Sequence, residues 1–130
     1  MSYETATTRR LLDAPEVTAL VEQRVDWDRR EQGAPLSAIT LETINDPRPQ
    51  HFKGFYATRG TRVQVNCWAA SRAAAVQLRD AVLAALVGPA EAGGVRFQRA
   101  QDISIRPTFE RTETEELYRE IIDITLWHNG

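Results

Sequence analysis

The chain has 130 residues, of which 42% are hydrophobic and 26% are charged, with a formal net charge of −2 at neutral pH. This composition is ordinary for a globular protein and excludes an intrinsically disordered chain. The weak negative charge gives no general attraction to nucleic acid, so sequence-specific DNA binding is not expected. We expect a single domain over residues 1–130, because the length is close to the commonest domain size.

Cys67 is the only cysteine, so the fold has no internal disulfide and suits a reducing cytoplasm. No segment approaches the roughly 18 apolar residues that a membrane-spanning helix needs, and the N-terminal residues lack the apolar stretch of a secretory signal. We therefore expect a soluble protein without a targeting segment.

The first third of the chain predicts two short helices and a strand. Residues 3–21 have helical periodicity that Pro15 interrupts, because an interior proline removes an amide donor and clashes with the preceding turn. Residues 24–27 indicate a short extended exit from the second helix. Turn residues at 31–35 then precede an alternating pattern over 36–44, which predicts a strand.

Residues 45–60 break regular structure and yet carry three aromatic side chains, Phe52, Phe55 and Tyr56. A loop of this length is uncommon in a compact domain unless it has a function. Aromatic side chains are unfavourable to leave exposed, so we predict that these three dock onto a neighbouring protein. The alternative is a loop that folds back over its own sheet and packs by its own side chains.

The clearest unit is a strand followed by a helix over residues 61–86. The helix is expected to begin after Ser71, a good N-cap residue, and to end before Gly88 and Pro89. In the strand, polar and apolar residues alternate, which predicts two different faces. The polar face carries Arg62, Gln64, Asn66 and Trp68, and the apolar face carries Val63, Val65 and Cys67.

The last third of the chain predicts further strands. After a flexible link at 89–94, residues 95–99 and 103–109 are typical of strands, and a polar turn then leads to a long alternating strand over 117–128. Taken together, the pattern predicts an α+β fold: an antiparallel or mixed sheet of four to five strands, with one long helix and short N-terminal helices packed against it.

Residues that carry catalysis or bind metals are few. His51 and His128 are the only histidines, and neither has a second ligand at metal-binding spacing. Cys67 alternates in phase with apolar neighbours and is predicted to be buried rather than reactive. The acidic residues within 110–120 are interspersed with arginines, which is typical of a solvated surface. We expect no catalytic residue, no cofactor and no metal ion.

Five segments, in this order and at this spacing, resemble the tail-completion family of long-tailed phages. The family is also called tail terminator or head-tail joining proteins and also occurs in prophages and gene transfer agents. Its most specific elements here are the RVQVNCWA strand that enters the alanine-rich helix and the terminal strand with Trp127 and His128. Ser37 departs from the pattern, since family members often have a second proline there. The segments are LLDAPEVTALVEQRV (11–25), GAPLSAITLETI (33–44), TRVQVNCWAASRAAAVQLRDAVLAAL (61–86), GGVRF (93–97) and LYREIIDITLWHN (117–129).

The resemblance implies a structural protein that closes the growing end of the tail tube as a ring, commonly a hexamer, and joins it to the head connector. The implied partners are further copies of the chain, the tail-tube protein and the head connector. Double-stranded DNA would pass through the lumen without sequence-specific binding, and no membrane is involved. The implied location is the tail-head junction of the virion, and the host cytoplasm during assembly.

Two groups of residues are predicted to make the contacts. Trp68 lies in phase with Arg62 on the polar strand face, where a large aromatic side chain is a candidate anchor for a subunit contact. The alternative is that a helix or loop of the same chain covers Trp68. Phe52, Phe55 and Tyr56 form the second group, as candidates for docking to a neighbouring ring.

Other functions remain open at the level of sequence. The chain could be a different head-tail connector adaptor or a tail-tube subunit, and its position in the particle would distinguish these. A small ligand-binding domain or enzyme with a similar α+β architecture is a further alternative. A deep pocket with convergent polar groups would favour that class.

Overall fold

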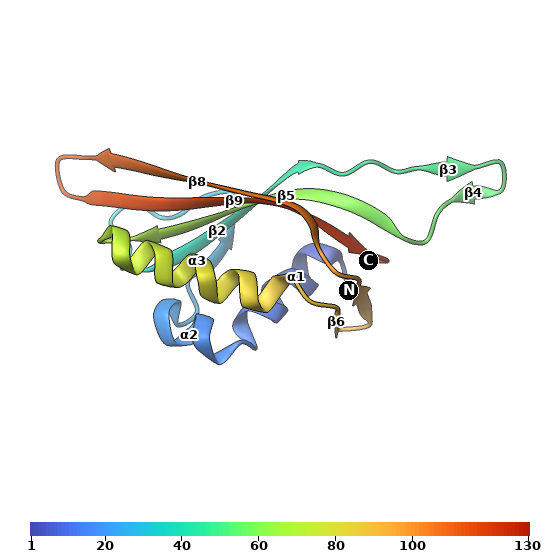
Figure 1. Ribbon diagram of the computed structural model, residues 1–130, viewed down its shortest axis with the longest axis horizontal. Helices are drawn as coiled ribbons and strands as arrows, with labels where there is room; N and C mark the ends of the chain where they lie inside the picture. Colours follow the sequence, from blue (N-terminus) through green and yellow to red (C-terminus); the bar gives the residue numbers. More distant parts are fainter.

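The computed structural model describes residues 1–130. Three helices lie on one face of a seven-stranded mixed sheet, and a separate two-stranded sheet projects from one end (Figure 1). The helices are α1 (Tyr3–Leu12), α2 (Pro15–Val21) and α3 (Arg72–Leu86).

The sequence signals for the helix ends are confirmed. α2 starts at Pro15, and the N-terminal helical region therefore divides as predicted. Proline is suited to the first position of a helix, because the N–H group there has no partner within the helix and its absence breaks no hydrogen bond. The hydroxyl of Ser71 accepts a hydrogen bond from the backbone N–H of Ala74 at 3.1 Å and caps α3. Ser2 caps α1 in the same way, accepting from Thr5 at 3.2 Å.

The large sheet has the order β1-β2-β5-β9-β7-β6. β8 is a further neighbour of β9 and pairs with it on the same side as β7, opposite β5. β1 and β2 are parallel, whereas all other neighbours are antiparallel. The two long central strands pair from Arg59 opposite His128 to Ala69 opposite Tyr118. The strands are β1 (Val25–Trp27), β2 (Ala38–Asn45), β5 (Arg59–Ala69), β6 (Ala90–Ala92), β7 (Val95–Phe97), β8 (Gln101–Arg111) and β9 (Glu116–His128).

The two faces of the sheet differ in chemistry, as the alternation in the sequence predicts. The face that meets the helices is apolar, and its buried side chains join those of the helices in one core. The opposite face carries the polar side chains of β5 and has no helix over it (Figure 1). The strand residues of the apolar face include Ile39, Leu41, Val63, Val65, Cys67, Ile122, Ile124 and Leu126.

The predicted fold class is wrong in its architecture. A sheet of four to five strands under one long helix was expected, whereas the chain forms nine strands, seven of them in one sheet. The extra strands are two or three residues long. Such strands contain no complete repeat of apolar and polar positions, so periodicity cannot reveal them.

Residues 89–94, which were expected to form a flexible link, show why periodicity misses such short strands. Ala90–Ala92 forms β6 and pairs with β7, with Ala92 opposite Val95. The turn between them is Gly93-Gly94, and both residues have positive φ, +54° and +83°. Two consecutive residues with positive φ are what the tightest hairpin turns need, and glycine adopts that conformation without steric cost. The Gly-Gly pair is therefore a hairpin turn.

A buried ion pair fastens α3 to the sheet. The carboxylate of Glu120 on β9 is 4% exposed and accepts hydrogen bonds from Arg72 at 2.8 Å and from Arg79 at 2.7 Å, both on α3. The two guanidinium groups are partly exposed, at 37% and 24%. Both oxygens of the buried carboxylate thus have partners, as a buried charge requires.

We predict that Glu120→Ala lowers the free energy of unfolding by about 2 kcal/mol, because it leaves two cations beside the core without their partner. Urea denaturation of the purified protein measures this. Glu116→Ala is the matched control, since its pair with Arg111 is exposed and contributes at most about 1 kcal/mol. Equal effects of the two substitutions would contradict the role of the buried pair.

Candidate assembly surfaces

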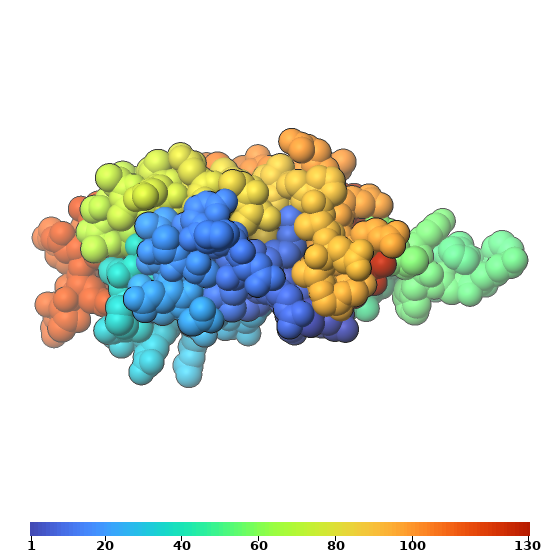
Figure 2. Space-filling view, turned by 90° about the horizontal axis from the view of Figure 1, so that it is seen from below, coloured from blue at the N-terminus to red at the C-terminus, as the bar shows by residue number.

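The most prominent projection of the molecule is an arm made of residues 46–58, which extends well beyond the helices and the large sheet (Figures 1 and 2). It continues β2, turns back through the small sheet and returns into β5. The small sheet consists of β3 (Gln50–His51) and β4 (Gly54–Phe55). The segment that the sequence marked as irregular is therefore a hairpin.

The structure brings the three predicted docking aromatics together on this arm. Phe52 is 95% exposed, Phe55 65% and Tyr56 55%. The imidazole of His51 packs edge-on against Tyr56, with ring centroids 4.9 Å apart. The arm does not fold back over the sheet, so these side chains contribute almost nothing to the core.

The base of the arm is fixed by Asp46. One carboxylate oxygen accepts hydrogen bonds from Arg59 and from the hydroxyl of Thr61, both at 2.8 Å, and the other accepts from Arg48 at 2.9 Å. Burial opposes ionisation of this carboxyl group, but the hydrogen bonds outweigh burial and lower its pKa from 3.8 to about 2. Asp46 thus ties both strands of the arm together where they leave the sheet.

His128 continues this network into the core. Its Nδ1 accepts from the backbone N–H of Gly130 at 3.1 Å, so the neutral ring carries its proton on Nε2 and donates it to Thr61 at 2.7 Å. The ring also stacks on Tyr3 of α1, with centroids 4.7 Å apart. Burial, together with the positive charge of Arg59, lowers the pKa of His128 from 6.5 to about 4.

We predict that the protein loses stability as the pH falls from 6.5 to 4. In this window the unfolded chain takes up a proton on His128 that the folded chain does not bind, at about 1.4 kcal/mol for each unit of pKa difference. The total loss is about 3 kcal/mol, measured by denaturation at several pH values. A His128→Gln variant should lose most of this pH dependence, whereas His51→Gln, changed on the exposed arm, should keep it. Identical profiles of the two variants would contradict the assignment.

Arg62 and Trp68 lie on the same polar sheet face but not in one patch. They are six residues apart on β5, which corresponds to about 20 Å along an extended strand. Arg62 reaches across β9 and donates hydrogen bonds to the hydroxyl of Thr125, at 3.2 Å, and to the backbone carbonyl of Asp102. It therefore links β5 to the start of β8.

Trp68 is half-buried by its own chain. Its indole N–H donates to the hydroxyl of Thr40 at 2.9 Å. Two guanidinium groups lie over its ring, Arg119 at 4.7 Å and Arg30 at 6.0 Å from the centroid. Part of the indole still lines an open pocket of about 410 Å³ on this face, so a subunit contact at Trp68 stays a prediction.

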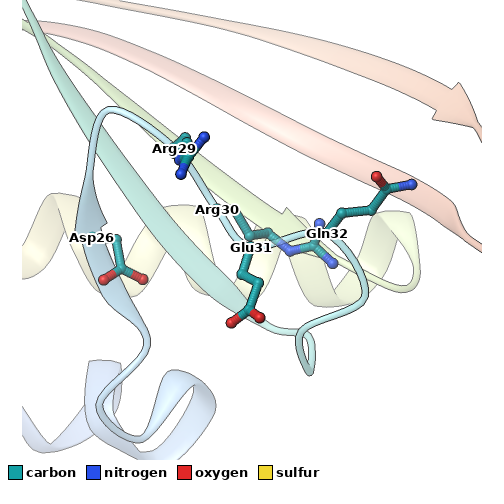
Figure 3. A pocket seen from close by; sticks show the side chains of 5 residues that line it. All are labelled: Asp26, Arg29, Arg30, Glu31 and Gln32. Carbon is teal, nitrogen blue, oxygen red and sulfur yellow. The ribbon is translucent and has the colours of Figure 1, made fainter.

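Arg30, one of the two residues whose guanidinium group lies over the Trp68 ring, comes from the loop between β1 and β2. Arg30 in this loop pairs with Glu115 in the β8–β9 turn at 2.6 Å, and the two side chains are only 8% and 13% exposed. This pair holds the loop across the polar face of the sheet. Beside it lies a second pocket, of about 610 Å³, whose labelled side chains are all polar (Figure 3). The pocket has no apolar wall of the kind that encloses small molecules.

The candidate catalytic and metal-binding residues do not converge. His51 is on the exposed arm and His128 is in the core. Cys67 is fully buried, and burial raises the pKa of its thiol. No three His, Cys, Asp or Glu side chains are grouped so as to hold a metal ion. None of the helices has the length and apolar character to cross a membrane.

Sequence reasoning missed the two networks that shape these surfaces. Asp46, Thr61 and His128 come from three separate segments, and Arg30 and Glu115 are 85 residues apart. No local pattern links such residues, so only the fold reveals them. The sequence did hold one usable signal, the alternation of Ile103, Ile105 and Phe109, which marks an apolar face on β8.

The arm and the polar sheet face are the surfaces that the helices leave uncovered. Residues 5–129 match the family described as "Tail completion protein gp17", and the chain belongs to this family of structural phage-tail proteins. The resemblance seen in the sequence is thereby confirmed.

A chain in the solved structure "Virion of native gene transfer agent (GTA) particle" has the same fold. The two chains are 20% identical and superpose with a TM-score of 0.67, over 98% of this chain and 94% of the other. At this level of identity the likeness concerns the fold. No curated protein matches the sequence significantly.

Proposed function

We propose that this protein closes the end of a phage or gene transfer agent tail tube as a ring and joins the tube to the head connector. Membership of the tail completion family supports a role in the tail, and the fold shared with a chain of a gene transfer agent virion agrees with it. The observation that carries the proposal is the arm, because it presents three aromatic side chains that the chain itself leaves uncovered. Its site of action is the tail-head junction, after assembly in the host cytoplasm.

In this proposal the arm docks onto a neighbouring ring. Burial of one aromatic side chain stabilises a contact by roughly 1.5–3 kcal/mol, so two or three offset much of the cost of ordering the partner surfaces. The hydrogen bonds of Asp46 already fix the direction in which the arm leaves the sheet. A preorganised arm binds with a smaller loss of conformational entropy.

We predict that changing Phe52, Phe55 and Tyr56 together to Ser abolishes joining of tails to heads and shifts the melting temperature of the isolated protein by no more than about 2 °C, because exposed side chains add little to stability. Electron microscopy of lysates counts joined particles, and thermal denaturation reports folding. Gln50→Ser on the same arm is the control and should leave joining intact. If the triple variant unfolds instead, the arm belongs to the core and does not dock.

The polar sheet face, with Arg62 and Trp68, is proposed to contribute to the contact between subunits of the ring. The remaining partners are the tail-tube protein on one side and the head connector on the other. Double-stranded DNA passes through the lumen without sequence-specific contacts, in keeping with a formal net charge of −2. The protein acts through these contacts and not as an enzyme.

We predict that native mass spectrometry of the detached tail end finds a closed ring of this chain. A hexamer has six times the mass of 14.7 kDa, about 88 kDa. Trp68→Ala should reduce ring formation, and its melting temperature must be measured alongside because Trp68 also bonds to Thr40. A stable dimer in the assembled particle would refute the ring, whereas normal assembly of the variant would remove only the contact at Trp68.

A different place in the same apparatus is the main alternative, as a connector adaptor or a tail-tube subunit. The number of copies and the position of the protein distinguish the three roles. One ring at the head-proximal end of the tube agrees with the proposal, and many stacked rings along the tube identify a tube subunit.

A further inference from the structure

The β8–β9 turn forms one end of the molecule, and an exposed aromatic side chain lies beside it. Phe109, near the end of β8, packs against Tyr118 of β9 with ring centroids 4.9 Å apart, and yet it is 49% exposed. It lies on the helix side of the sheet, because its partner Tyr118 alternates in phase with the core residue Ile122. The helices thus leave about half of this side chain free to contact a partner.

The same end carries carboxylates that have no partner within the chain. Glu110 and Glu113 are exposed, and neither forms an ion pair. The other two carboxylates of the turn, those of Glu115 and Glu116, are each paired with an arginine. Negative charge that nothing in the chain balances therefore lies next to Phe109.

An open hollow of about 500 Å³ lies beside the β6–β7 hairpin. Its lining includes the apolar residues Pro89, Ala90 and Phe97. Arg96 and Arg99 also line it, and both are exposed and form no ion pair. The hollow thus combines apolar lining residues with two unpaired guanidinium groups.

The charge of the hollow is opposite to that of the turn. Among its lining residues the two arginines face one carboxylate, that of Glu91, which leaves one positive charge in excess. In the turn, residues 110–116 contain four glutamates and one arginine, an excess of three negative charges. Opposite charges steer two surfaces together and favour one relative orientation.

We propose that the β8–β9 turn of one copy of this chain docks into the hollow of the next copy, with Phe109 as the anchor. Glu110 and Glu113 then lie against Arg96 and Arg99. The proposal rests on the ring proposed above and names two surfaces that form it. An aromatic side chain that fills a pocket of the partner is a typical anchor of a protein interface.

The two surfaces cannot meet within one chain. Phe97 pairs with His128 at one end of β9, whereas Phe109 pairs with Tyr118 near the other end, and these positions are about 33 Å apart along the strand. Figures 1 and 2 show the β8–β9 turn and the β6–β7 hairpin far apart along the molecule. The contact therefore joins two different surfaces of two copies, and contacts of this kind form a ring when the rotation closes.

The docking end also contains Trp68, the residue proposed above for the subunit contact. Trp68 is opposite Arg119 of β9, which in turn is opposite Thr108, the neighbour of Phe109. The two aromatic side chains thus lie at the same end of the sheet, on its two faces, where one partner can contact both. Neither the turn nor the hollow includes a residue of the arm, which stays available for the neighbouring ring.

Cysteine cross-linking in assembled particles tests the docking. Glu113→Cys is combined with Arg96→Cys in one chain and with Arg99→Cys in another, and the native Cys67 is buried and does not compete. After oxidation, at least one combination should give a ladder of bands at multiples of 14.7 kDa, and the single-cysteine variants should not. No ladder in either combination, or a cross-link to a different protein, overturns the proposal.

Removal of the anchor gives a second readout. Phe109→Ser should lower the yield of rings about tenfold, as truncation of a central interface residue does. Ile103→Ser is the matched control, because Ile103 alternates in phase with Phe109 on the same strand, is 39% exposed and lies about 20 Å away. It should leave ring formation unchanged, and both variants should keep the melting temperature within about 2 °C. Equal yields of rings from the two variants would refute the anchor.

Charge reversal tests the groups around the anchor. Changing Glu110 and Glu113 together to Arg, or Arg96 and Arg99 together to Glu, should lower the yield of rings about tenfold. A chain that carries all four changes should recover most of the yield, because the opposite charges then meet again. A four-residue variant no better than the two others would refute the charged contact.

The two proposals fail in different ways. Rings of this chain at the tail end that give no cross-links would disprove the docking of the turn and leave the function intact. Absence of the protein from the tail end would disprove the function itself.

Discussion

The structure depends on the burial of one face of the β5–β9 pair. Most of the side chains that point to the helices from these two strands are apolar and buried, and α3 lies on this face; they are Val63, Val65, Cys67, Ile122, Ile124 and Leu126. Burial of apolar area is the main stabilising contribution to folding, and here it acts on one side of the sheet only. The helix layer is shorter than the sheet and its arm, so the surfaces available to partners are those that the helices leave uncovered.

Long elements could be predicted from the sequence because they contain several repeats of their own period. The α3 helix with its Ser71 cap, the division at Pro15 and the alternating strands β5 and β9 all follow from local chemistry. The number of strands could not be predicted, because β1, β3, β4 and β6 are two or three residues long and exist only through their neighbours. A strand of that length is stabilised by tertiary pairing rather than by propensity.

The same distinction applies to the surfaces. Phe52, Phe55 and Tyr56 could be singled out because aromatic residues in a long segment rich in Pro and Gly are unusual, and the structure places all three on the arm. How far Trp68 is covered could not be predicted. Its environment is set by Arg30, in a loop without a repeating pattern, and by a partner of Arg30 that is far away in the sequence. Side chains that meet only in the folded chain are outside the reach of local patterns.

The position of β9 has a consequence for synthesis of the protein. β9 joins β5, β7 and β8, and all three of these strands precede it in the chain. While a nascent chain leaves the ribosome, they therefore have no central strand to pair with, and the core face stays open. A polypeptide that still lacks β9 thus has no strand with which β8 can pair, because β9 is the only neighbour of β8.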